Sequence, residues 1–311
     1  MDARAQVDIL VATGRDEAAW CEALRAELPQ ARVHASLGAP PCDYAVLWKP
    51  AAGLFERQRR LKAMFSLGAG VNSLLAMPEL PGDVPLVRME DAGMAAQMVE
   101  YALYVALREF RAMRAYAADQ ASMRWAPRPV EPRGDFRIGV LGLGVLGGAV
   151  ARELAAFGFD VIGWSRTGAA PAGVRGVSGQ AGLLETLSTS RLLFVFLPAT
   201  PATTGLIGKA ALAKLPRGAA IANLARGEVL DERALLSALD AGHVAAAYLD
   251  VFAEEPLPPG DPLWSHPCVS ITPHVAALTD VRAACVQIAS KIAAFEAGQS
   301  VTGVVDRTRG Y

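Results

Sequence analysis

The chain contains few of the residues that build disulfide scaffolds or zinc sites. Among its 311 residues there are four cysteines, Cys21, Cys42, Cys268 and Cys285, which are widely spaced and form no CxxC pair. This spacing argues against both a disulfide framework and a zinc site. We therefore expect reduced, packed thiols, as in a cytoplasmic protein, and no bound metal.

The chain also lacks an excess of charge of one sign and any long apolar run. Its formal net charge is −1, so no overall basic field favours nucleic acid or an anionic membrane. No uncharged apolar stretch reaches the roughly 18 residues of a membrane span. The start, Met-Asp-Ala-Arg, carries no basic segment followed by an apolar one, so no signal peptide is expected.

Short apolar runs alternate with helical patterns along the chain. This alternation predicts an α/β fold with parallel sheets covered by helices on both faces. The expected strands are 7–12, 43–48, 62–67, 136–141, 161–164, 192–197, 219–224, 245–251 and 269–272. The expected helices are one that Asp16 caps and that runs to Leu28, then 95–118, 148–157 and 281–297.

Hydrophobic residues make up 52% of the chain and charged residues 20%, which at this length predicts two packed domains. The helical pattern returns at the end of the chain, so we expect one domain to be inserted in the other. The outer domain would comprise residues 1–98 and 281–311, and the inner domain residues 99–280.

A glycine-rich turn, Gly142-Leu143-Gly144-Val145-Leu146-Gly147, follows an apolar run and precedes a helical one. Strand, glycine turn and helix are the context in which backbone amides face a pyrophosphate. Gly142 would permit the tight turn, Gly144 the close approach of the ligand, and Gly147 close packing of helix on sheet. The turn predicts a dinucleotide site.

The next strand ends in Gly163-Trp164-Ser165-Arg166-Thr167, without the carboxylate that NAD sites place there for the ribose 2′-hydroxyl. Arg166 can pair with a 2′-phosphate, and Ser165 and Thr167 can hydrogen-bond to it. A carboxylate would repel that phosphate. The segment therefore predicts NADP(H) in preference to NAD(H).

Three dispersed polar residues each follow an apolar run: Arg226, Glu255 and His274. Reduction of a 2-keto acid needs a cation for the carboxylate and keto oxygen, a proton donor, and a partner that orients the donor. The cation would be Arg226, the proton donor His274, and the partner that orients the donor Glu255. The neighbouring Glu254 is a rival for Glu255.

Several segments resemble the D-2-hydroxyacid dehydrogenase family, and most of all its glyoxylate/hydroxypyruvate reductase A branch. The segments typical of that branch are Val46-Leu47-Trp48-Lys49-Pro50, Ser66-Leu67-Gly68-Ala69-Gly70-Val71, Met98-Val99-Glu100-Tyr101, Gly163-Trp164-Ser165-Arg166 and the tail from Val301 to Tyr311. The Arg, Glu and His motifs are typical of the wider family. The resemblance covers essentially the whole chain.

The resemblance implies two Rossmann-like domains, with a flavodoxin-like substrate domain formed by both chain ends and hinged to a central dinucleotide-binding domain across the active cleft. It implies that Arg226 binds the substrate, that His274 is the acid and base, and that Glu255 is its partner. Further substrate-binding residues would be Trp48, Gly68, Ala69 and Gly70, with Trp48 favouring small substrates. Further cofactor-binding residues would be Leu197, Pro198, Thr203, Ala225 and Asp250.

The implied activity is NADPH-dependent reduction of glyoxylate to glycolate and of hydroxypyruvate to D-glycerate. The helical segment near residues 100–118 resembles the family's dimerisation region, so a homodimer is expected. Two alternatives stay open: a dinucleotide-sensing regulatory protein without turnover, and an NAD-dependent D-2-hydroxyacid dehydrogenase of other specificity. The complete Arg, Glu and His set argues against the first. The absent carboxylate after Gly163 argues against the second.

Overall fold

The computed structural model describes residues 6–68 and 70–311, and its chain divides into two compact units. Unit 1 combines both ends of the chain, up to Met94 and from Thr279 onward, and unit 2 is Ala95–Leu278. These divisions fall a few residues before the boundaries that we predicted at 98/99 and 280/281. The chain has the two-domain α/β fold with parallel sheets that the sequence predicts.

Unit 1 is built on a parallel sheet with strand order β2-β1-β3-β4-β5. This is the flavodoxin-like order, in which the chain reverses direction across the sheet between β1 and β3. Its strands are β1 (Asp8–Ala12), β2 (Arg32–Ala35), β3 (Tyr44–Leu47), β4 (Ala63–Ser66) and β5 (Leu86–Arg88). Its helices are α1 (Glu17–Glu27), α2 (Asn72–Leu75) and α9 (Val281–Glu296).

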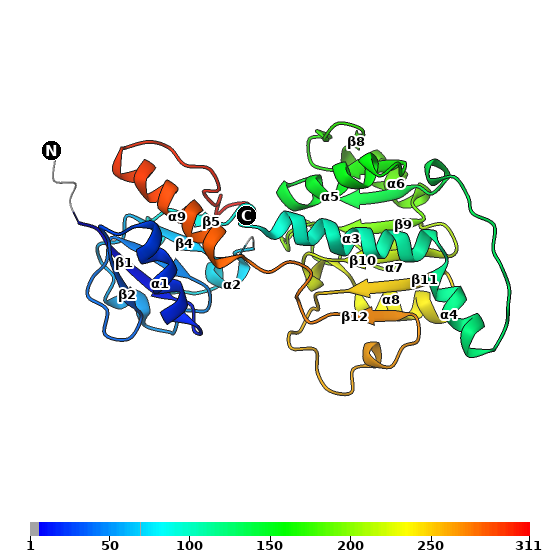
Figure 1. The fold of residues 1–311 in the computed structure, drawn as a ribbon, viewed down its shortest axis with the longest axis horizontal. Helices are drawn as coiled ribbons and strands as arrows, with labels where there is room; N and C mark the ends of the chain where they lie inside the picture. Colours follow the sequence, from blue (N-terminus) through cyan, green and yellow to red (C-terminus); the bar gives the residue numbers. More distant parts are fainter. Residues whose placement is uncertain (1–5, 69) are drawn as a thin grey trace. The chain divides into compact units, whose positions relative to one another are not determined.

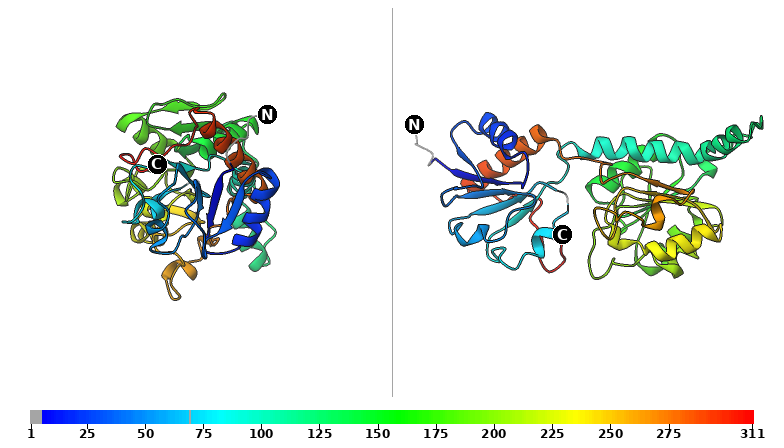
Figure 2. Two further views of the ribbon diagram at one scale, coloured as in Figure 1. Left: turned by 90° about the vertical axis from the view of Figure 1, so that its left-hand side faces the viewer. Right: turned by 90° about the horizontal axis from the view of Figure 1, so that it is seen from below.

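Helices α1 and α9 come from opposite ends of the chain and pack side by side in unit 1 (Figures 1 and 2). The buried residues of α1 include Trp20 and Leu24, and those of α9 include Ile288 and Ile292. Asp280 begins α9 by accepting a hydrogen bond from the Ala283 amide at 2.7 Å. The C-terminal helix is therefore part of the core of the N-terminal fold.

Unit 2 contains a parallel sheet with strand order β12-β11-β10-β9-β6-β7-β8. The strands are β6 (Ile138–Leu141), β7 (Val161–Trp164), β8 (Arg175–Val177), β9 (Leu192–Val195), β10 (Ala219–Asn223), β11 (Val244–Leu249) and β12 (Val269–Ile271). Strand order reverses between β6 and β9. In open α/β sheets, ligands bind at the carboxyl ends of the strands beside such a reversal.

Helices cover both faces of this sheet. The helices are α3 (Met94–Phe110), α4 (Met113–Ala121), α5 (Val145–Ala156), α6 (Gly179–Thr189), α7 (Lys209–Leu212) and α8 (Glu232–Asp240). Helices α3 and α5 pack on one face through residues such as Val105 and Val150, and α6 to α8 cover the other through residues such as Leu187 and Leu235 (Figure 1). The central strands β6, β9 and β10 are buried on both sides and so read as continuous apolar runs.

The structure corrects two predictions about helices. The helix predicted over 95–118 is two helices, α3 and α4, because Ala112 takes a left-handed backbone with φ 51° that interrupts the helical hydrogen bonds. Asp16 does precede α1, but its own left-handed backbone leaves its side chain without a capping hydrogen bond. The short strands β2, β5 and β8 were not predicted, because they carry no long apolar run.

Candidate functional site

The glycine turn connects β6 to α5, beside the reversal of strand order. Gly142 has φ 95°, and a Cβ atom there would lie 2.6 Å from the Phe196 carbonyl oxygen. A Cβ atom on Gly147 would lie 2.1 Å from the Gly142 carbonyl oxygen, so this glycine lets α5 sit close to the strand. A side chain at either position would force the turn apart.

Gly144 is different, because no described atom lies within 4 Å of the position that its Cβ would occupy. It stands directly before α5 and, as a glycine, has no side chain that could cap the first turn of the helix. The twelve-residue helix α5 therefore begins at Val145 directly after a position that is open to a ligand. An open cradle at a helix N-terminus fits the pyrophosphate of a dinucleotide.

The segment after β7 forms a compact loop at the same edge of the sheet. The Ser165 hydroxyl accepts a hydrogen bond from the Gly168 amide at 3.1 Å, and the Thr167 hydroxyl accepts one from the Ala169 amide at 3.3 Å. The Trp164 indole donates to the Gly179 carbonyl at 2.9 Å. These bonds hold the loop that carries Arg166 in a defined shape.

The segment after β9 also ends at this edge. Leu197 is buried, and the Thr203 hydroxyl donates to the Pro198 carbonyl at 2.5 Å. The same hydroxyl oxygen accepts the Thr200 amide at 2.9 Å. The side chain of Thr203 thus fixes the loop beside the glycine turn.

Arg226 lies just beyond β10, at the carboxyl edge. The buried Asn223 side chain donates to the Arg226 carbonyl at 2.9 Å, which fixes the backbone from which the guanidinium extends. Burial lowers the pKa of Arg226, and the nearby Glu228 and Glu255 carboxylates act in the opposite direction. An arginine stays protonated despite such a shift, so the guanidinium supplies a fixed positive charge.

Within the described residues, the hydrogen bond that the Arg226 guanidinium makes is from Nη1 to the Ala225 carbonyl. The remaining donors of its planar fork have the geometry to hold a carboxylate. Among these residues, no carboxylate lies within ion-pair distance of Arg226. A substrate anion would therefore meet no competing carboxylate at this cation.

His274 follows β12, and its Nδ1 atom lies 2.8 Å from Oε2 of Glu255. Because an ionised carboxylate can only accept, Nδ1 must carry the proton, and Nε2 is left to exchange a proton with a ligand. The other oxygen of Glu255 accepts the Phe252 amide at 3.1 Å. The structure thus brings Glu255, rather than its rival Glu254, to the imidazole.

Asp250, directly after β11, holds the loop that carries His274. Its carboxylate is 2% exposed and accepts hydrogen bonds from the amides of Val275 at 2.9 Å and Ala276 at 3.0 Å. Its carbonyl accepts the His274 amide at 2.8 Å. The resemblance implied a cofactor-binding Asp250, and the contacts add a role in supporting the histidine loop that sequence reasoning missed.

Gly227 brings the Arg226 segment against the Glu255 segment. A Cβ atom on Gly227 would lie 1.9 Å from the Phe252 carbonyl carbon and 2.3 Å from the Ala253 nitrogen. The two backbones therefore touch where a side chain would not fit. The motif Asn223-Leu224-Ala225-Arg226-Gly227 was recognised in the sequence, but neither Gly227 nor Asn223 was assigned a role.

In unit 1, Trp48 and Gly68 lie together at the carboxyl edge of its sheet. A Cβ atom on Gly68 would lie 2.4 Å from a ring carbon of Trp48, so the indole rests directly on the glycine. Gly70 is half-buried nearby in sequence, whereas Ala69 lies outside the described residues. Trp48 also lines a pocket of about 380 Å³ with Lys49, Ser73 and Met77.

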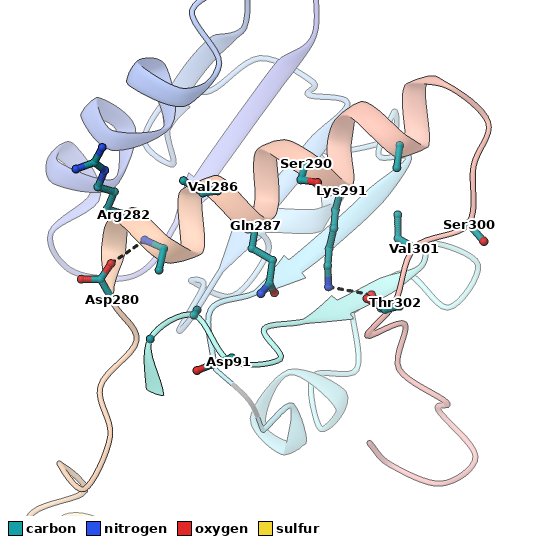
Figure 3. Close-up of a pocket in the computed structure, with 14 residues that line it drawn as sticks. Asp91, Asp280, Arg282, Val286, Gln287, Ser290, Lys291, Ser300, Val301 and Thr302 are labelled. Atoms are coloured by element: carbon teal, nitrogen blue, oxygen red, sulfur yellow. Dashed lines mark hydrogen bonds between the residues drawn. The ribbon is translucent and has the colours of Figure 1, made fainter. Parts of the chain in front are cut away.

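A larger pocket, of about 860 Å³, lies beside α9 in unit 1 (Figure 3). Gln287 and Lys291 line it from α9, and Thr302 from the C-terminal segment. The Lys291 ammonium is already bound by Glu90 at 3.0 Å and the Thr302 carbonyl at 2.9 Å. None of the predicted site residues that the structure describes lines this pocket.

Two features are absent from the described part of the chain. No helix there is both long enough and apolar enough to cross a membrane. No group of three or more histidine, cysteine, aspartate or glutamate side chains there is arranged to hold a metal ion.

Comparison with known proteins gives a consistent result. Residues 103–276 match the family model described as the D-isomer specific 2-hydroxyacid dehydrogenase, NAD binding domain. A D-isomer specific 2-hydroxyacid dehydrogenase from Xanthobacter autotrophicus Py2, solved in complex with NADPH and MES, is 42% identical with a TM-score of 0.95. The match covers 99% of this chain and 100% of that one.

Two further solved structures are similar over nearly their whole lengths. The NADPH-dependent glyoxylate/hydroxypyruvate reductase of Sinorhizobium meliloti, with NADP and sulfate, is 38% identical with a TM-score of 0.91, covering 98% of this chain and 100% of that one. A probable 2-hydroxyacid dehydrogenase of Rhizobium etli CFN 42, with NADP, HEPES and L(+)-tartaric acid, is 33% identical with a TM-score of 0.89, covering 99% and 100%.

Proposed function

Because this chain belongs to the D-isomer specific 2-hydroxyacid dehydrogenase family, we propose that it is an NADPH-dependent reductase of small 2-keto acids. Its substrates are glyoxylate, which becomes glycolate, and hydroxypyruvate, which becomes D-glycerate. The observation that carries the proposal is the contact of 2.8 Å between His274 and Glu255, on the same sheet edge as the cation Arg226. The 38% identity to the reductase of Sinorhizobium meliloti supports these two substrates.

We propose that the dinucleotide binds across the Gly142–Gly147 turn, where Gly144 and the start of α5 leave room for a pyrophosphate. Arg166, with Ser165 and Thr167, selects the 2′-phosphate of NADPH over the hydroxyl of NADH. Two relatives crystallised with NADPH or NADP support this preference. The chemistry that the cofactor supplies when bound is transfer of a hydride to the carbonyl carbon.

Three residues of the protein bind the substrate and supply the proton. Arg226 binds the substrate carboxylate and polarises the keto oxygen. His274 donates the proton from Nε2 to that oxygen, and Glu255 holds the imidazole through Nδ1 and stabilises its protonated form before transfer.

We also assign Trp48, Gly68, Ala69 and Gly70 to substrate binding, with the large indole of Trp48 limiting the size of the substrate.

The test is the oxidation of NADPH and NADH by purified protein, with glyoxylate, hydroxypyruvate and pyruvate offered separately. Fast turnover of the first two with NADPH is the expected result. Faster turnover with NADH would contradict the cofactor assignment alone. Binding of NADPH without turnover of any 2-keto acid would contradict the enzyme and favour a dinucleotide sensor.

We further propose that the protein is a homodimer that uses α4 and the segment after it. Met123 and Trp125 are 95% and 97% exposed, and Met113 on α4 is exposed as well. Their segment is held in shape, because Asp119 pairs with Arg124 and Arg128. A shaped apolar surface of this kind fits a second copy of the chain.

Sedimentation of the wild-type protein and of a Met123→Lys, Trp125→Ser double variant tests this assembly. A dimeric wild type and a monomeric variant are expected. A wild type that is monomeric at micromolar concentration would contradict the dimer.

A further inference from the structure

A tyrosine on α3 extends the set of contacts that hold the catalytic histidine loop. The Tyr101 hydroxyl lies 2.8 Å from the Thr272 hydroxyl, which lies 2.6 Å from Oδ1 of Asp250. Asp250 in turn binds the amides of Val275 and Ala276 on the far side of His274. Both sides of the histidine are thus tied to one buried carboxylate, and one side is tied further to α3.

The direction of these hydrogen bonds follows from the chemistry of the groups. The Asp250 carboxylate is buried and already accepts two backbone amides, so it takes the Thr272 hydroxyl as a further donor. Thr272 has a single hydroxyl proton, and its oxygen must therefore accept from Tyr101. Burial raises the pKa of Tyr101, which keeps this phenol protonated and able to donate.

The histidine loop needs such support because of its backbone. His274 has φ 56°, in the left-handed region that residues other than glycine rarely adopt. A backbone of this kind persists only where the surrounding contacts hold it. The loop is short, and the donors that bind Asp250 come from Thr272, Val275 and Ala276, on both sides of the strained residue.

Tyr101 is well placed to transmit this restraint. Its neighbours on α3, Ala102 and Val105, are fully buried in the core of unit 2, so the helix that carries the hydroxyl is anchored. The hydroxyl therefore acts from a rigid element on a loop. Without the Tyr101 hydroxyl, the oxygen of the half-buried Thr272 side chain would lack a donor. The Thr272 side chain could then turn away from Asp250.

We propose that Tyr101 and Thr272 are positioning residues, which act through Asp250 to fix the His274 backbone so that Nε2 faces the substrate. The inference rests on the proposed function, since it assigns them to the proton-transfer step. Neither residue touches substrate or cofactor in this role. Their removal should therefore lower kcat much more than it lowers cofactor affinity.

The experiment compares Tyr101→Phe, Thr272→Val and the double variant with the wild type. Each single variant removes one hydroxyl and keeps its bulk, and we expect each to lower kcat about tenfold, as for one lost hydrogen bond. The double variant should be no worse than Thr272→Val, because both act through one chain of bonds. The dissociation constant for NADPH should change far less than kcat.

Two matched controls separate positioning from general damage. Thr272→Ser retains the hydroxyl and should restore most of kcat. Tyr104→Phe removes an exposed hydroxyl from the same helix, one that binds Arg108 instead, and should match the wild type. A Thr272→Ser variant as slow as Thr272→Val would overturn the role of the hydroxyl.

A second readout does not depend on turnover. Amide hydrogen exchange at Val275 and Ala276 should be faster in Tyr101→Phe, whereas exchange in β10 should not change. Unaltered exchange at both amides, or faster exchange with wild-type kcat, would overturn the proposal. A wild-type protein that reduces no 2-keto acid would contradict the proposed function, while the exchange experiment would still test the restraint on the loop.

Discussion

The Nδ1 atom of His274 lies 2.8 Å from Oε2 of Glu255, and this contact decides which nitrogen of the imidazole is left to react. The carboxylate accepts a hydrogen bond from the protonated Nδ1, so Nε2 is on the side of the ring that faces away from it. The two residues are nineteen positions apart and follow different strands, β11 and β12, which are neighbours in the sheet. Their meeting is therefore a product of the parallel sheet.

Glu255→Gln should lower kcat on the order of 10²-fold, within the range for general acid–base catalysis. Glutamine keeps the size of the side chain but removes the charge that favours the imidazolium, and its amide can donate to Nδ1 and reverse the tautomer. Steady-state kinetics with glyoxylate measure the change. The matched control is Glu254→Gln, an exposed neighbour, which should keep wild-type activity. Equal losses in both variants would refute the assignment of Glu255.

Arg226→Ala should reduce kcat/KM on the order of 10²–10³-fold, as for loss of a donor to a developing oxyanion. The half-buried guanidinium is the cation at this edge of the sheet that we assign to the substrate, and water cannot replace its fork of donors. Arg233→Ala, an exposed arginine on α8, is the control. Activity of Arg226→Ala within a few-fold of wild type would remove its proposed role.

Arg166→Ala should raise KM for NADPH by about 10-fold to 100-fold, as expected for loss of charge-assisted hydrogen bonds, and leave KM for NADH nearly unchanged. The ratio of the two kcat/KM values is the measurement. Arg175→Ala is the control, because this arginine on the neighbouring strand pairs with Glu185 at 2.7 Å. An unaltered ratio in Arg166→Ala would mean that another group selects the cofactor.

The strands of the fold were largely predictable because parallel strands are buried on both faces. Residues 161–164 were predicted as a strand and form β7, and the runs at 219–224 and 269–272 end within one residue of β10 and β12. The edge strand β8 was missed because its residues, Arg175–Val177, are exposed or half-buried and carry no apolar pattern. The break at Ala112 was missed because alanine favours a helix, and only tertiary context imposes its left-handed backbone.

The site was predictable as a set of residues and not as a set of contacts. A motif indicates which side chains carry chemistry, and the parallel sheet predicts that they meet at one edge. The sequence pattern does not predict that Asp250 binds the amides of Val275 and Ala276, because these contacts depend on the path of a loop. Gly227 was likewise quoted in its motif, but its contact with Phe252 exists only in the folded chain.

Acid should destabilise unit 1 partly through Asp8. Arg32 and His34 bind this buried carboxylate, and the hydrogen bond from Arg32 lowers the pKa of Asp8 to about 2, below its ordinary value of 3.8. The lowered pKa means that the ionised group stabilises the fold above about pH 4. This contribution is lost as the pH falls toward 2.

Asp8→Asn should therefore lower the free energy of unfolding by about 1–3 kcal/mol at pH 6, as for loss of a hydrogen-bonded charge, and by roughly half as much at pH 3, where the folded carboxyl is still largely ionised. Urea unfolding at both pH values measures the difference. Asp83→Asn removes an exposed carboxylate from the same unit and should have little effect at either pH. A loss of stability in Asp8→Asn that does not depend on pH would contradict the role of its charge.

Gly227→Ala should impair stability and catalysis together, because its methyl group would occupy the place of the Phe252 carbonyl carbon, 1.9 Å away. Overpacking of a tight contact costs about 1–3 kcal/mol, and here both neighbours are backbone and cannot rotate aside. Each kcal/mol lowers the melting temperature of a unit of this size by roughly 2–4 °C. Separating the two segments would also move Arg226 away from the His274–Glu255 pair, so kcat/KM should fall with NADPH affinity retained.

Gly134→Ala, at a position with no described atom within 4 Å of the added carbon, is the control for Gly227→Ala. A Gly227→Ala protein that melts and reacts like Gly134→Ala would show that the two segments need not touch.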